Sequence, residues 1–270
     1  MLIPSINTLG LPDWTFAQVV DFAQAQHIPY LEIRALRNTV DLLSLPEFST
    51  PSAVRDAAGY LRDSGVSLLS LNLGFHLTDD LYAHSATIRR YAALARDLGA
   101  LYLRFFPGGL PGQPPDLERM ALGAGLANHL LAGFPVQWVV ETHDSLVRSA
   151  DILDLDRQME GRLNVLWDIA HTHNTGGEDW ATTYAALAPR IRYLHIKDTR
   201  RQEGQVRLAP LFTGDLDLCA LLAYLQQKPE PVIVSLEWER LWDPTLAPGD
   251  EVALDFLKQV RDLPSSGAAR

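Results

Sequence analysis

Eight short apolar runs recur along the chain, and each is followed by a turn and a longer amphipathic segment. The runs are mostly continuous and do not alternate between apolar and polar residues, which is typical of strands buried on both faces of a parallel sheet. Strands that alternate with helices in this way predict an α/β fold. We expect the strands at residues 2–7, 30–34, 67–73, 101–106, 136–141, 164–169, 192–196 and 232–237.

The segments between these runs have the spacing of helices, with apolar residues at positions i, i+3 and i+4. Several open with an aspartate that can cap the first turn, and two end at a glycine that can close the last turn. The segment after the fifth strand has the least regular pattern. We expect helices within residues 15–26, 51–65, 87–99, 116–133, 145–158, 179–189, 214–227 and 250–260.

Two architectures accommodate eight strand–helix units: an open doubly wound sheet and a closed barrel. The 270 residues divide into units of about 34 residues, close to the ~30 residues of a strand–crossover–strand unit. The number of units, and the lack of a glycine-rich phosphate turn after the first strand, favour the barrel. Because no linker-like segment divides the chain, we predict a single (β/α)₈ TIM barrel domain over residues 1–263. We expect residues 264–270 to form a flexible tail.

Composition excludes several classes of protein. A hydrophobic content of 47% is enough to fill a core, so the chain is not intrinsically disordered. A net charge of −10 opposes binding to the phosphate backbone of nucleic acids. Without an export signal or a membrane-spanning run, a cytoplasmic protein with no membrane partner is expected. The single cysteine, Cys219, lies in an apolar stretch, so we expect it in the core.

Each of the last four predicted strands ends on a side chain that can bind a metal ion. Steps of 27, 27 and 42 residues separate these side chains, so each step spans one strand–helix unit. Because the carboxyl ends of barrel strands converge on one mouth, four ligands that are distant in sequence can meet there. Three carboxylates and one imidazole suit Mn²⁺ or Mg²⁺ and are also acceptable to Co²⁺ or Zn²⁺. The predicted ligands of one divalent ion are Glu141, Asp168, His195 and Glu237.

The positions of the histidines also place the functional site at this end of the barrel. Three of the eight fall in predicted helices or at their ends, whereas the other five follow or end a predicted strand: His76, His143, His171, His173 and His195. We expect His76, His143 and His171 to lie near the mouth, and His76 and His143 to contact substrate. For His143 and His173 the alternative is a hydrogen bond within a loop.

The ordered set Glu141, Asp168-x-x-His171, His195-x-Lys197-Asp198 and Glu237 resembles the xylose isomerase-like barrel superfamily of sugar (phosphate) isomerases and epimerases. The resemblance extends from SLNLGF, at residues 70–75, to the final helix. It implies a (β/α)₈ barrel with one divalent ion held by the four predicted ligands. It also implies substrate contacts from His171 and from Arg201, which lies six positions after His195. One departure is the stretch PLFTGDLD, which keeps only Gly214 of a glycine pair that family members often show.

These residues suggest proton transfer next to a carbonyl group. A divalent ion would bind oxygens of a keto sugar or related polyol and stabilise the enediolate that forms. Glu141 and Glu237 would be the catalytic pair, one removing the proton and the other returning it. Return to the neighbouring carbon gives isomerisation, and return to the opposite face of the same carbon gives epimerisation. The expected partner is a small carbohydrate, which Arg201 could also hold through a phosphate.

Other functions of the same barrel remain open. An apurinic endonuclease IV-like nuclease would need an Asp-x-His pair some dozen residues after His195, and the segment EGQVRLAPLF contains neither residue. An inosose-type dehydratase would use the same metal and base, and a non-catalytic sugar-binding barrel could keep the metal without chemistry. No exposed apolar stripe is visible in the sequence, so both a monomer and a homodimer remain possible.

Overall fold

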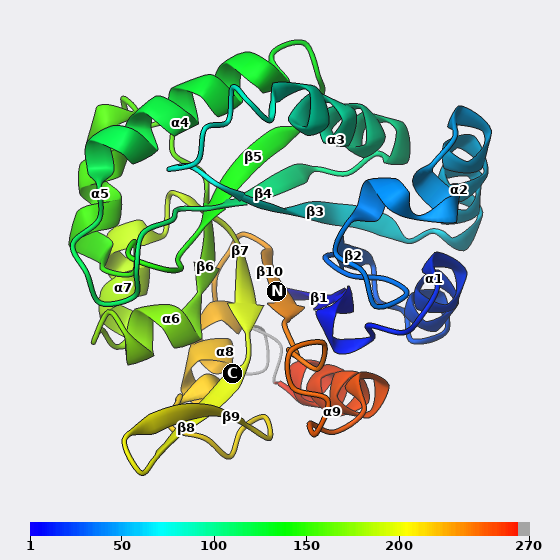
Figure 1. Ribbon diagram of the computed structural model, residues 1–270. Helices are drawn as coiled ribbons and strands as arrows, with labels where there is room; N and C mark the ends of the chain where they lie inside the picture. The colour runs from blue at the N-terminus through cyan, green and yellow to red at the C-terminus, as the bar shows by residue number, and fades with distance from the viewer. Residues whose placement is uncertain (264–270) are drawn as a thin grey trace.

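Eight parallel strands close into a barrel in the computed structural model, which describes residues 1–263 (Figure 1). The predicted (β/α)₈ barrel is thereby confirmed, and every expected strand overlaps an observed one. The predicted flexible tail, residues 264–270, lies outside the described residues. Around the barrel the strands are β1 (Leu2–Asn7), β10 (Val232–Leu236), β7 (Ile191–Ile196), β6 (Val165–Asp168), β5 (Gln137–Glu141), β4 (Tyr102–Phe106), β3 (Ser67–His76) and β2 (Tyr30–Ile33).

Helices surround the barrel and cover the outer faces of the strands (Figure 1). Their ends follow the local sequence signals. Thr15 forms a capping box with Gln18, and Gly65 ends the second helix in the left-handed region at φ 72°. All eight expected helices are found: α1 (Phe16–Ala25), α2 (Pro51–Ser64), α3 (Ser85–Leu98), α4 (Leu117–Leu131), α5 (Ser149–Gln158), α7 (Trp180–Leu187), α8 (Leu218–Gln226) and α9 (Gly249–Asp262).

Several short elements were not expected. The helix α6 (Ile169–Asn174) begins directly after β6, and three single-turn 3₁₀ helices lie in loops: η1 (Thr8–Gly10), η2 (Leu42–Ser44) and η3 (Pro46–Phe48). An antiparallel hairpin of β8 (Asp198–Gln202) and β9 (Gln205–Ala209) follows β7 and projects at the bottom of the view in Figure 1. Most residues of the hairpin are exposed, and its strands lack the apolar runs of the barrel strands. The hydrophobic pattern therefore did not predict them.

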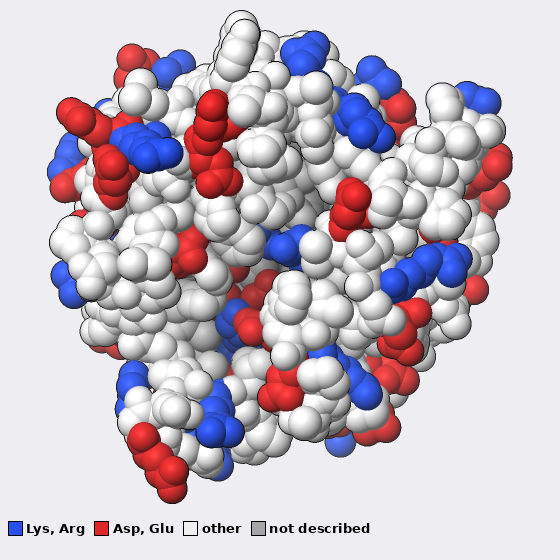
Figure 2. Space-filling model, in the orientation of Figure 1, with Lys and Arg blue, Asp and Glu red and all other residues white. Residues whose placement is uncertain are grey.

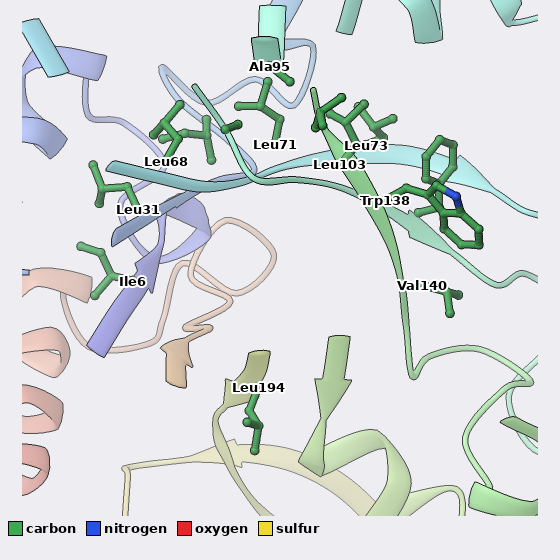
Figure 3. Packing of buried hydrophobic residues seen from close by; sticks show 14 of the residues in the cluster. Ile6, Leu31, Leu68, Leu71, Leu73, Ala95, Leu103, Trp138, Val140 and Leu194 are labelled. Carbon is green, nitrogen blue, oxygen red and sulfur yellow. The ribbon is translucent and has the colours of Figure 1, made fainter. Parts of the chain in front are cut away.

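The largest apolar core fills the layer between the strands and the helices. Strand residues that point outward alternate with residues that point into the barrel. In β5, for example, Trp138 and Val140 belong to the outer core, together with Leu103 and Leu194 of other strands (Figure 3). Their neighbours Val139 and Glu141 point into the barrel.

Inside the barrel, apolar and polar side chains occupy opposite ends. Near the amino ends of the strands, Leu69, Val139, Leu166 and Tyr193 form a separate buried cluster that fills the interior. Two residues after Val139, Leu166 and Tyr193, the same strands carry the inward-pointing polar residues Glu141, Asp168 and His195. Because these positions lie one layer closer to the carboxyl ends, the polar side chains gather at the mouth of the barrel.

The prediction that Cys219 lies in the core is wrong. The cysteine is exposed, while the buried face of α8 consists of Leu218, Leu221, Leu222 and Leu225. Each helical residue is rotated by about 100° from the one before, so a cysteine next to a buried leucine can face solvent. None of the helices in residues 1–263 is long and apolar enough to cross a membrane.

Candidate metal centre

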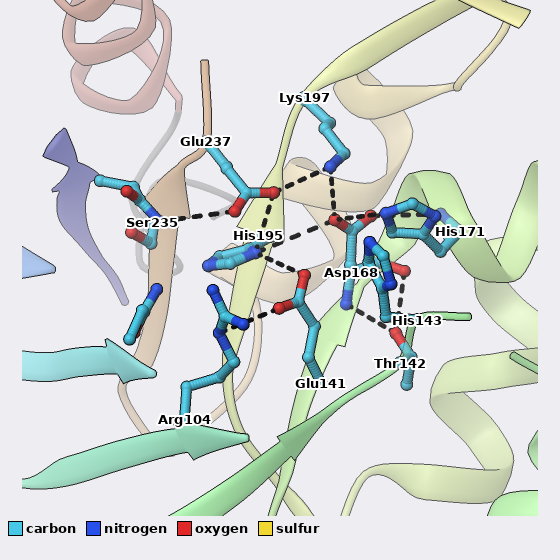
Figure 4. Close-up of polar contacts among 12 residues, drawn as sticks. Arg104, Glu141, Thr142, His143, Asp168, His171, His195, Lys197, Ser235 and Glu237 are labelled. Atoms are coloured by element: carbon cyan, nitrogen blue, oxygen red, sulfur yellow. Dashed lines mark hydrogen bonds and ion pairs between the residues drawn. The ribbon is translucent and has the colours of Figure 1, made fainter. Parts of the chain in front are cut away.

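The four predicted ligands meet at the mouth of the barrel (Figure 4). One ligand atom of each residue lies within 4.8 Å of the others, and all four side chains are buried. The residues come from the ends of β5, β6 and β7 and from the position that follows β10. Each occupies an inward-pointing position of its strand, which is why residues so far apart in sequence converge.

The backbone after β6 leaves one oxygen of Asp168 available. Asp168 is the N-cap of α6, and its Oδ1 accepts hydrogen bonds from the backbone amides of Ala170 (2.8 Å) and His171 (3.1 Å). The other oxygen, Oδ2, points into the cluster, where it makes no hydrogen bond within the described chain and has an ion-pair contact with Lys197. The helix cap therefore fixes the direction of the carboxylate.

His195 is oriented by Glu32, a fully buried residue of β2. Nε2 of His195 lies 2.9 Å from Oε2 of Glu32, so this nitrogen carries the proton and the Nδ1 atom faces the three carboxylates. Glu32 also accepts hydrogen bonds from Asn72 (2.7 Å), Tyr193 (2.8 Å) and Ser235 (2.8 Å). A carboxylate behind the imidazole is the usual arrangement around a metal-binding histidine.

Charge in the cluster is balanced by two buried cations. Burial by itself raises the pKa of Glu141, but Arg104, whose Nε lies 3.2 Å from Oε2 of Glu141, lowers it to about 2. Lys197 Nζ lies 2.8 Å from both Asp168 Oδ2 and Glu237 Oε2. Although burial favours neutral lysine, these carboxylates hold the pKa of Lys197 well above its ordinary value. Glu141 and Lys197 are therefore both charged at neutral pH.

The donor atoms fit a divalent cation. Within residues 1–263, the buried atoms Asp168 Oδ2 and His195 Nδ1 make no hydrogen bond, although buried polar atoms are normally hydrogen-bonded; their contacts are ion pairs with Lys197 and with carboxylates of the cluster itself. Burial lowers the pKa of His195, but Glu237, Glu32 and Glu141 raise it well above its ordinary value. A divalent ion would replace the proton on Nδ1 and offset the repulsion between the carboxylates. Three carboxylates and one imidazole suit such an ion.

A cavity of about 300 Å³ adjoins the cluster. His143, His171 and Lys197 form its inner wall, and Thr199 and Leu208 of the β8–β9 hairpin belong to its outer wall. Burial, together with Lys197 and His143, lowers the pKa of His171 to about 3, so this imidazole is neutral. The cavity therefore has room for a small polar molecule next to the four ligands.

The other predicted substrate-binding histidines lie in a row with Phe106 of β4. The ring centroids are 5.4 Å apart between His76 and Phe106, 4.7 Å between Phe106 and His143, and 4.2 Å between His143 and His171. Asp144 lies 2.7 Å from Nδ1 of His143, which leaves Nε2 of that histidine free. The structure thus brings His143 and His171 to the cavity, while His76 lies at the outer end of the row.

Arg201 lies apart from the cluster. It is an exposed residue of β8, and its guanidinium donates hydrogen bonds to the backbone oxygens of Gly204 and Asn174. A different arginine of the hairpin, Arg207, lines the cavity. Its place in the cavity wall depends on the hairpin, which the sequence did not reveal.

Three polar residues of the mouth were not singled out from the sequence: Glu32, Arg34 and Arg104. All are buried, with exposed fractions of 0%, 8% and 1%. Two of them, Glu32 and Arg104, lie in the middle of the apolar runs YLEIR and LYLRFF. A charged residue at a central position of a buried strand needs a partner of opposite charge or a hydrogen bond. A charge inside an apolar run could therefore have identified Glu32 and Arg104 from the sequence.

Solved structures with very different sequences share this fold. They include a probable 3-DHS dehydratase, AsbF, from Bacillus anthracis, with a TM-score of 0.77, 17% identity, and 96% of this chain and 99% of that chain covered. The IolI protein with a bound zinc atom has a TM-score of 0.75 and 18% identity, with 97% and 99% covered. A D-allulose 3-epimerase from Methylomonas sp. in complex with D-allulose has a TM-score of 0.71 and 16% identity, with 96% of each chain covered.

No curated protein matches the sequence. A profile of the family described as xylose isomerase-like TIM barrel matches residues 29–260, which is most of the chain. The match includes seven of the eight barrel strands and all four residues of the cluster. The resemblance noted from the sequence is therefore confirmed. The chain belongs to the xylose isomerase-like TIM barrel family.

Proposed function

We propose that this protein is a divalent-metal-dependent isomerase or epimerase. Its substrate would be a keto sugar, a sugar phosphate or a related polyol, and the reaction would pass through an enediolate. The observation that carries the proposal is the buried cluster of Glu141, Asp168, His195 and Glu237, in which Asp168 Oδ2 and His195 Nδ1 have no hydrogen-bond partner among residues 1–263. Sugar epimerases among the structures with this fold also support it.

The chemistry is proton transfer at a carbon next to a carbonyl group. A divalent ion in the cluster would polarise the carbonyl and make the neighbouring C–H bond more acidic. Glu141 and Glu237 reach the mouth from β5 and from the end of β10, with β6 and β7 between them. One carboxylate takes the proton from carbon, and the other delivers a proton to the adjacent carbon or to the opposite face of the same carbon.

Neighbouring residues would orient the substrate. His171 is neutral and has a buried Nε2 without a partner in the described chain, so it can hydrogen-bond a substrate hydroxyl. His143, held by Asp144, can do the same from the adjoining position. We keep His76 and Arg201 as proposed contacts for the outer part of a longer substrate, since both lie farther from the cluster than His171.

Exchange of hydrogen for deuterium tests the proposal without knowledge of the product. The protein would be stripped of metal, loaded with Mn²⁺ and incubated in D₂O with ketohexoses, hydroxypyruvate and inososes, and substrate C–H signals would be followed by NMR. We expect Mn²⁺-dependent loss of the signal next to the carbonyl. Glu141→Gln and Glu237→Gln should reduce the rate by about a hundredfold or more, because each removes a proton-transfer group.

An exposed carboxylate of α9 provides the control. Glu251→Gln should exchange at the wild-type rate, since Glu251 lies on the surface in the first turn of that helix. The proposal fails if calorimetry detects no Mn²⁺ binding that depends on Glu141 and Glu237. It also fails if no ketone exchanges.

The same experiments separate the alternative functions. An inosose-type dehydratase would release water and give a new carbon–carbon double bond in the NMR spectrum. A nuclease would cut an abasic duplex, which the net charge of −10 disfavours. A non-catalytic sugar-binding barrel would bind metal and sugar without exchange. A cytoplasmic location remains a prediction from the sequence. Both a monomer and a homodimer remain possible.

A further inference from the structure

Arg34 is a buried cation whose side chain forms no ion pair with the described part of the chain. It directly follows β2, its backbone N–H donates to Thr8 Oγ1 at 3.0 Å, and only 8% of the residue is exposed. Its Nη1 atom is buried and has no hydrogen-bond partner. Within residues 1–263, the guanidinium forms no ion pair. A buried guanidinium normally has its donors satisfied, because removing the charge from water is costly.

The neighbourhood of Arg34 is the barrel mouth. Burial and the positive charge of Arg104 lower the pKa of Arg34 to about 10, while Glu141 and Glu237 act in the opposite direction. Arg34 therefore remains positively charged at neutral pH and is electrostatically coupled to the candidate metal ligands. Figure 2 shows basic and acidic side chains together at the bottom of the hollow in the centre of this face.

Arg104, in contrast, already has its partners. Its Nε lies 3.2 Å from Glu141 Oε2, its Nη1 donates to the backbone oxygen of Leu73 at 3.0 Å, and its guanidinium carbon lies 3.7 Å from the centroid of the Phe106 ring. Arg34 follows β2 and Arg104 belongs to β4, so both lie on the β2–β4 side of the mouth. Of the two, only Arg34 forms no ion pair within residues 1–263.

A divalent ion in the cluster would leave the positive charge of Arg34 even less compensated. Glu141 and Glu237, which raise the pKa of Arg34, are the carboxylates that a divalent ion would neutralise. Arg34 would then face a site with less negative charge and the same positive neighbour, Arg104. An anion bound next to the metal would restore the balance and accept the unused hydrogen bonds.

The exposed arginines of the hairpin do not need an anionic partner in the same way. Arg207 and Arg201 are both exposed, so water can solvate their charges, and Arg201 already donates to two backbone oxygens. The demand for an anion is therefore specific to Arg34.

We propose that Arg34 binds an anionic group of the substrate, a carboxylate or a phosphate, and thereby selects anionic ketones over neutral ones. This inference rests on the proposed function, because it assumes a ketone bound at the metal cluster. The substrate would extend from the metal toward the β2–β4 side of the mouth. Arg34 would be a substrate-binding residue and would take no part in the proton transfer.

Three ketones of three carbons test the proposal. Dihydroxyacetone is neutral, hydroxypyruvate carries a carboxylate, and dihydroxyacetone phosphate carries a phosphate, yet all three share the same hydroxyketone unit. Calorimetry of the Mn²⁺-loaded protein should show at least about tenfold tighter binding of one anionic ketone than of dihydroxyacetone, since charge-assisted hydrogen bonds are the strong ones. The preferred anion identifies the group that Arg34 recognises.

Substitution of Arg34 should remove the preference alone. Arg34→Met should bind dihydroxyacetone and Mn²⁺ as the wild type does, but should bind the anionic ketone no more tightly than the neutral one. Arg34→Lys, which keeps the charge, should retain part of the preference. Arg55→Met provides a matched control, because Arg55 is an exposed residue of α2.

Thermal melting separates recognition from a structural role. If Arg34 only supports the fold, Arg34→Met should melt at a lower temperature and keep the anion preference, which would overturn the proposal. We expect an unchanged or higher melting temperature, because the substitution removes an unpaired buried charge. Equal affinity for the three ketones, or binding of none by a protein that binds Mn²⁺, would also overturn it.

A metal-free measurement keeps this test independent of the proposed function. If the wild type fails to bind Mn²⁺, the proposed function is wrong. The effect of inorganic phosphate on the melting temperature of the metal-free protein can still be compared with that of chloride at equal ionic strength. We expect phosphate to stabilise the wild type more than Arg34→Met, and equal stabilisation would contradict anion binding by Arg34.

Discussion

Glu32 determines how His195 faces the candidate metal centre, although the two residues are 163 positions apart. The carboxylate holds Nε2 of the imidazole and is itself held by Asn72, Tyr193 and Ser235. Because so many donors fix the carboxylate, the imidazole has one orientation and one tautomer. This role was not evident from the sequence, since nothing in the run YLEIR indicates which strand Glu32 faces.

Glu32→Gln should weaken Mn²⁺ binding by about 10- to 100-fold, the usual effect of losing a group that orients a metal ligand. The amide can donate to Nε2 and thereby stabilise the wrong tautomer of His195. Calorimetric titration of the metal-free protein measures the change. Tyr193→Phe serves as the control, since it removes one donor to Glu32 and leaves the contact with His195, and it should bind Mn²⁺ nearly as the wild type does. Wild-type affinity in Glu32→Gln would show that Glu32 does not orient the ligand.

At the scale of elements, α4 packs closely against the end of β3. A Cβ atom on Gly123 would lie 1.9 Å from the backbone oxygen of Leu77, just after β3, whereas a Cβ on Gly125 would have no neighbour within 4 Å. The two glycines are two residues apart in the same helix and so face different surroundings. The helical pattern in the sequence predicted the helix but did not distinguish the two positions.

Substitution by alanine should change the free energy of unfolding in opposite directions at the two positions. Gly123→Ala should lower the free energy of unfolding by about 1–3 kcal/mol, because α4 or the loop after β3 must move. Gly125→Ala should raise it by roughly 0.5–1 kcal/mol, since alanine is the better helix former. Urea denaturation followed by circular dichroism measures both. Equal effects of the two substitutions would mean that the close approach at Gly123 is unimportant.

The β8–β9 hairpin is one of the elements that the sequence did not reveal. Its two-residue turn places Glu203 at φ 50° and Gly204 at φ 80°, and the strands on either side are mainly polar and exposed. Few buried apolar contacts hold the hairpin, so it should open locally more readily than the barrel does.

Gly204→Val should open the hairpin without unfolding the barrel, because a β-branched residue at this positive φ is strained. We expect faster tryptic cleavage at the arginines of the hairpin and an unchanged melting temperature for the whole protein. Gln205→Val, next to the turn in β9, should be cleaved at the wild-type rate. Slow cleavage of Gly204→Val would show that contacts elsewhere hold the hairpin closed.

At the level of the whole molecule, the candidate metal centre spans one half of the barrel. Its four candidate ligands come from β5, β6, β7 and the end of β10, which are four consecutive strands around the barrel. A metal ion bound by all four would stabilise only the folded chain, because the ligands are far apart in sequence. In the metal-free protein, Lys197 partly offsets the charge of Asp168 and Glu237.

Mn²⁺ should therefore raise the melting temperature of the protein. At a concentration of 100 times Kd, linkage gives about 2.7 kcal/mol, which corresponds to roughly 5–10 °C for a chain of this size. Differential scanning calorimetry with Mn²⁺ and with EDTA measures the difference. Asp168→Asn should reduce it strongly, and equal melting temperatures of the wild type in Mn²⁺ and in EDTA would contradict the metal site.

The barrel and the convergence of Glu141, Asp168, His195 and Glu237 could both be predicted from the sequence. Both follow from local patterns, since eight buried strands alternate with helices and each candidate ligand stands at the end of a strand. Closure of a parallel barrel brings these ends together whatever the details of packing.

The surroundings of these four residues, in contrast, could not be predicted from the sequence. Glu32 behind His195, Arg104 beside Glu141 and the unpartnered Arg34 depend on how β2 and β4 face the other strands across the barrel. Those contacts are set by the register of the closed sheet and by the inward direction of each side chain, and neither is encoded in any short stretch of sequence.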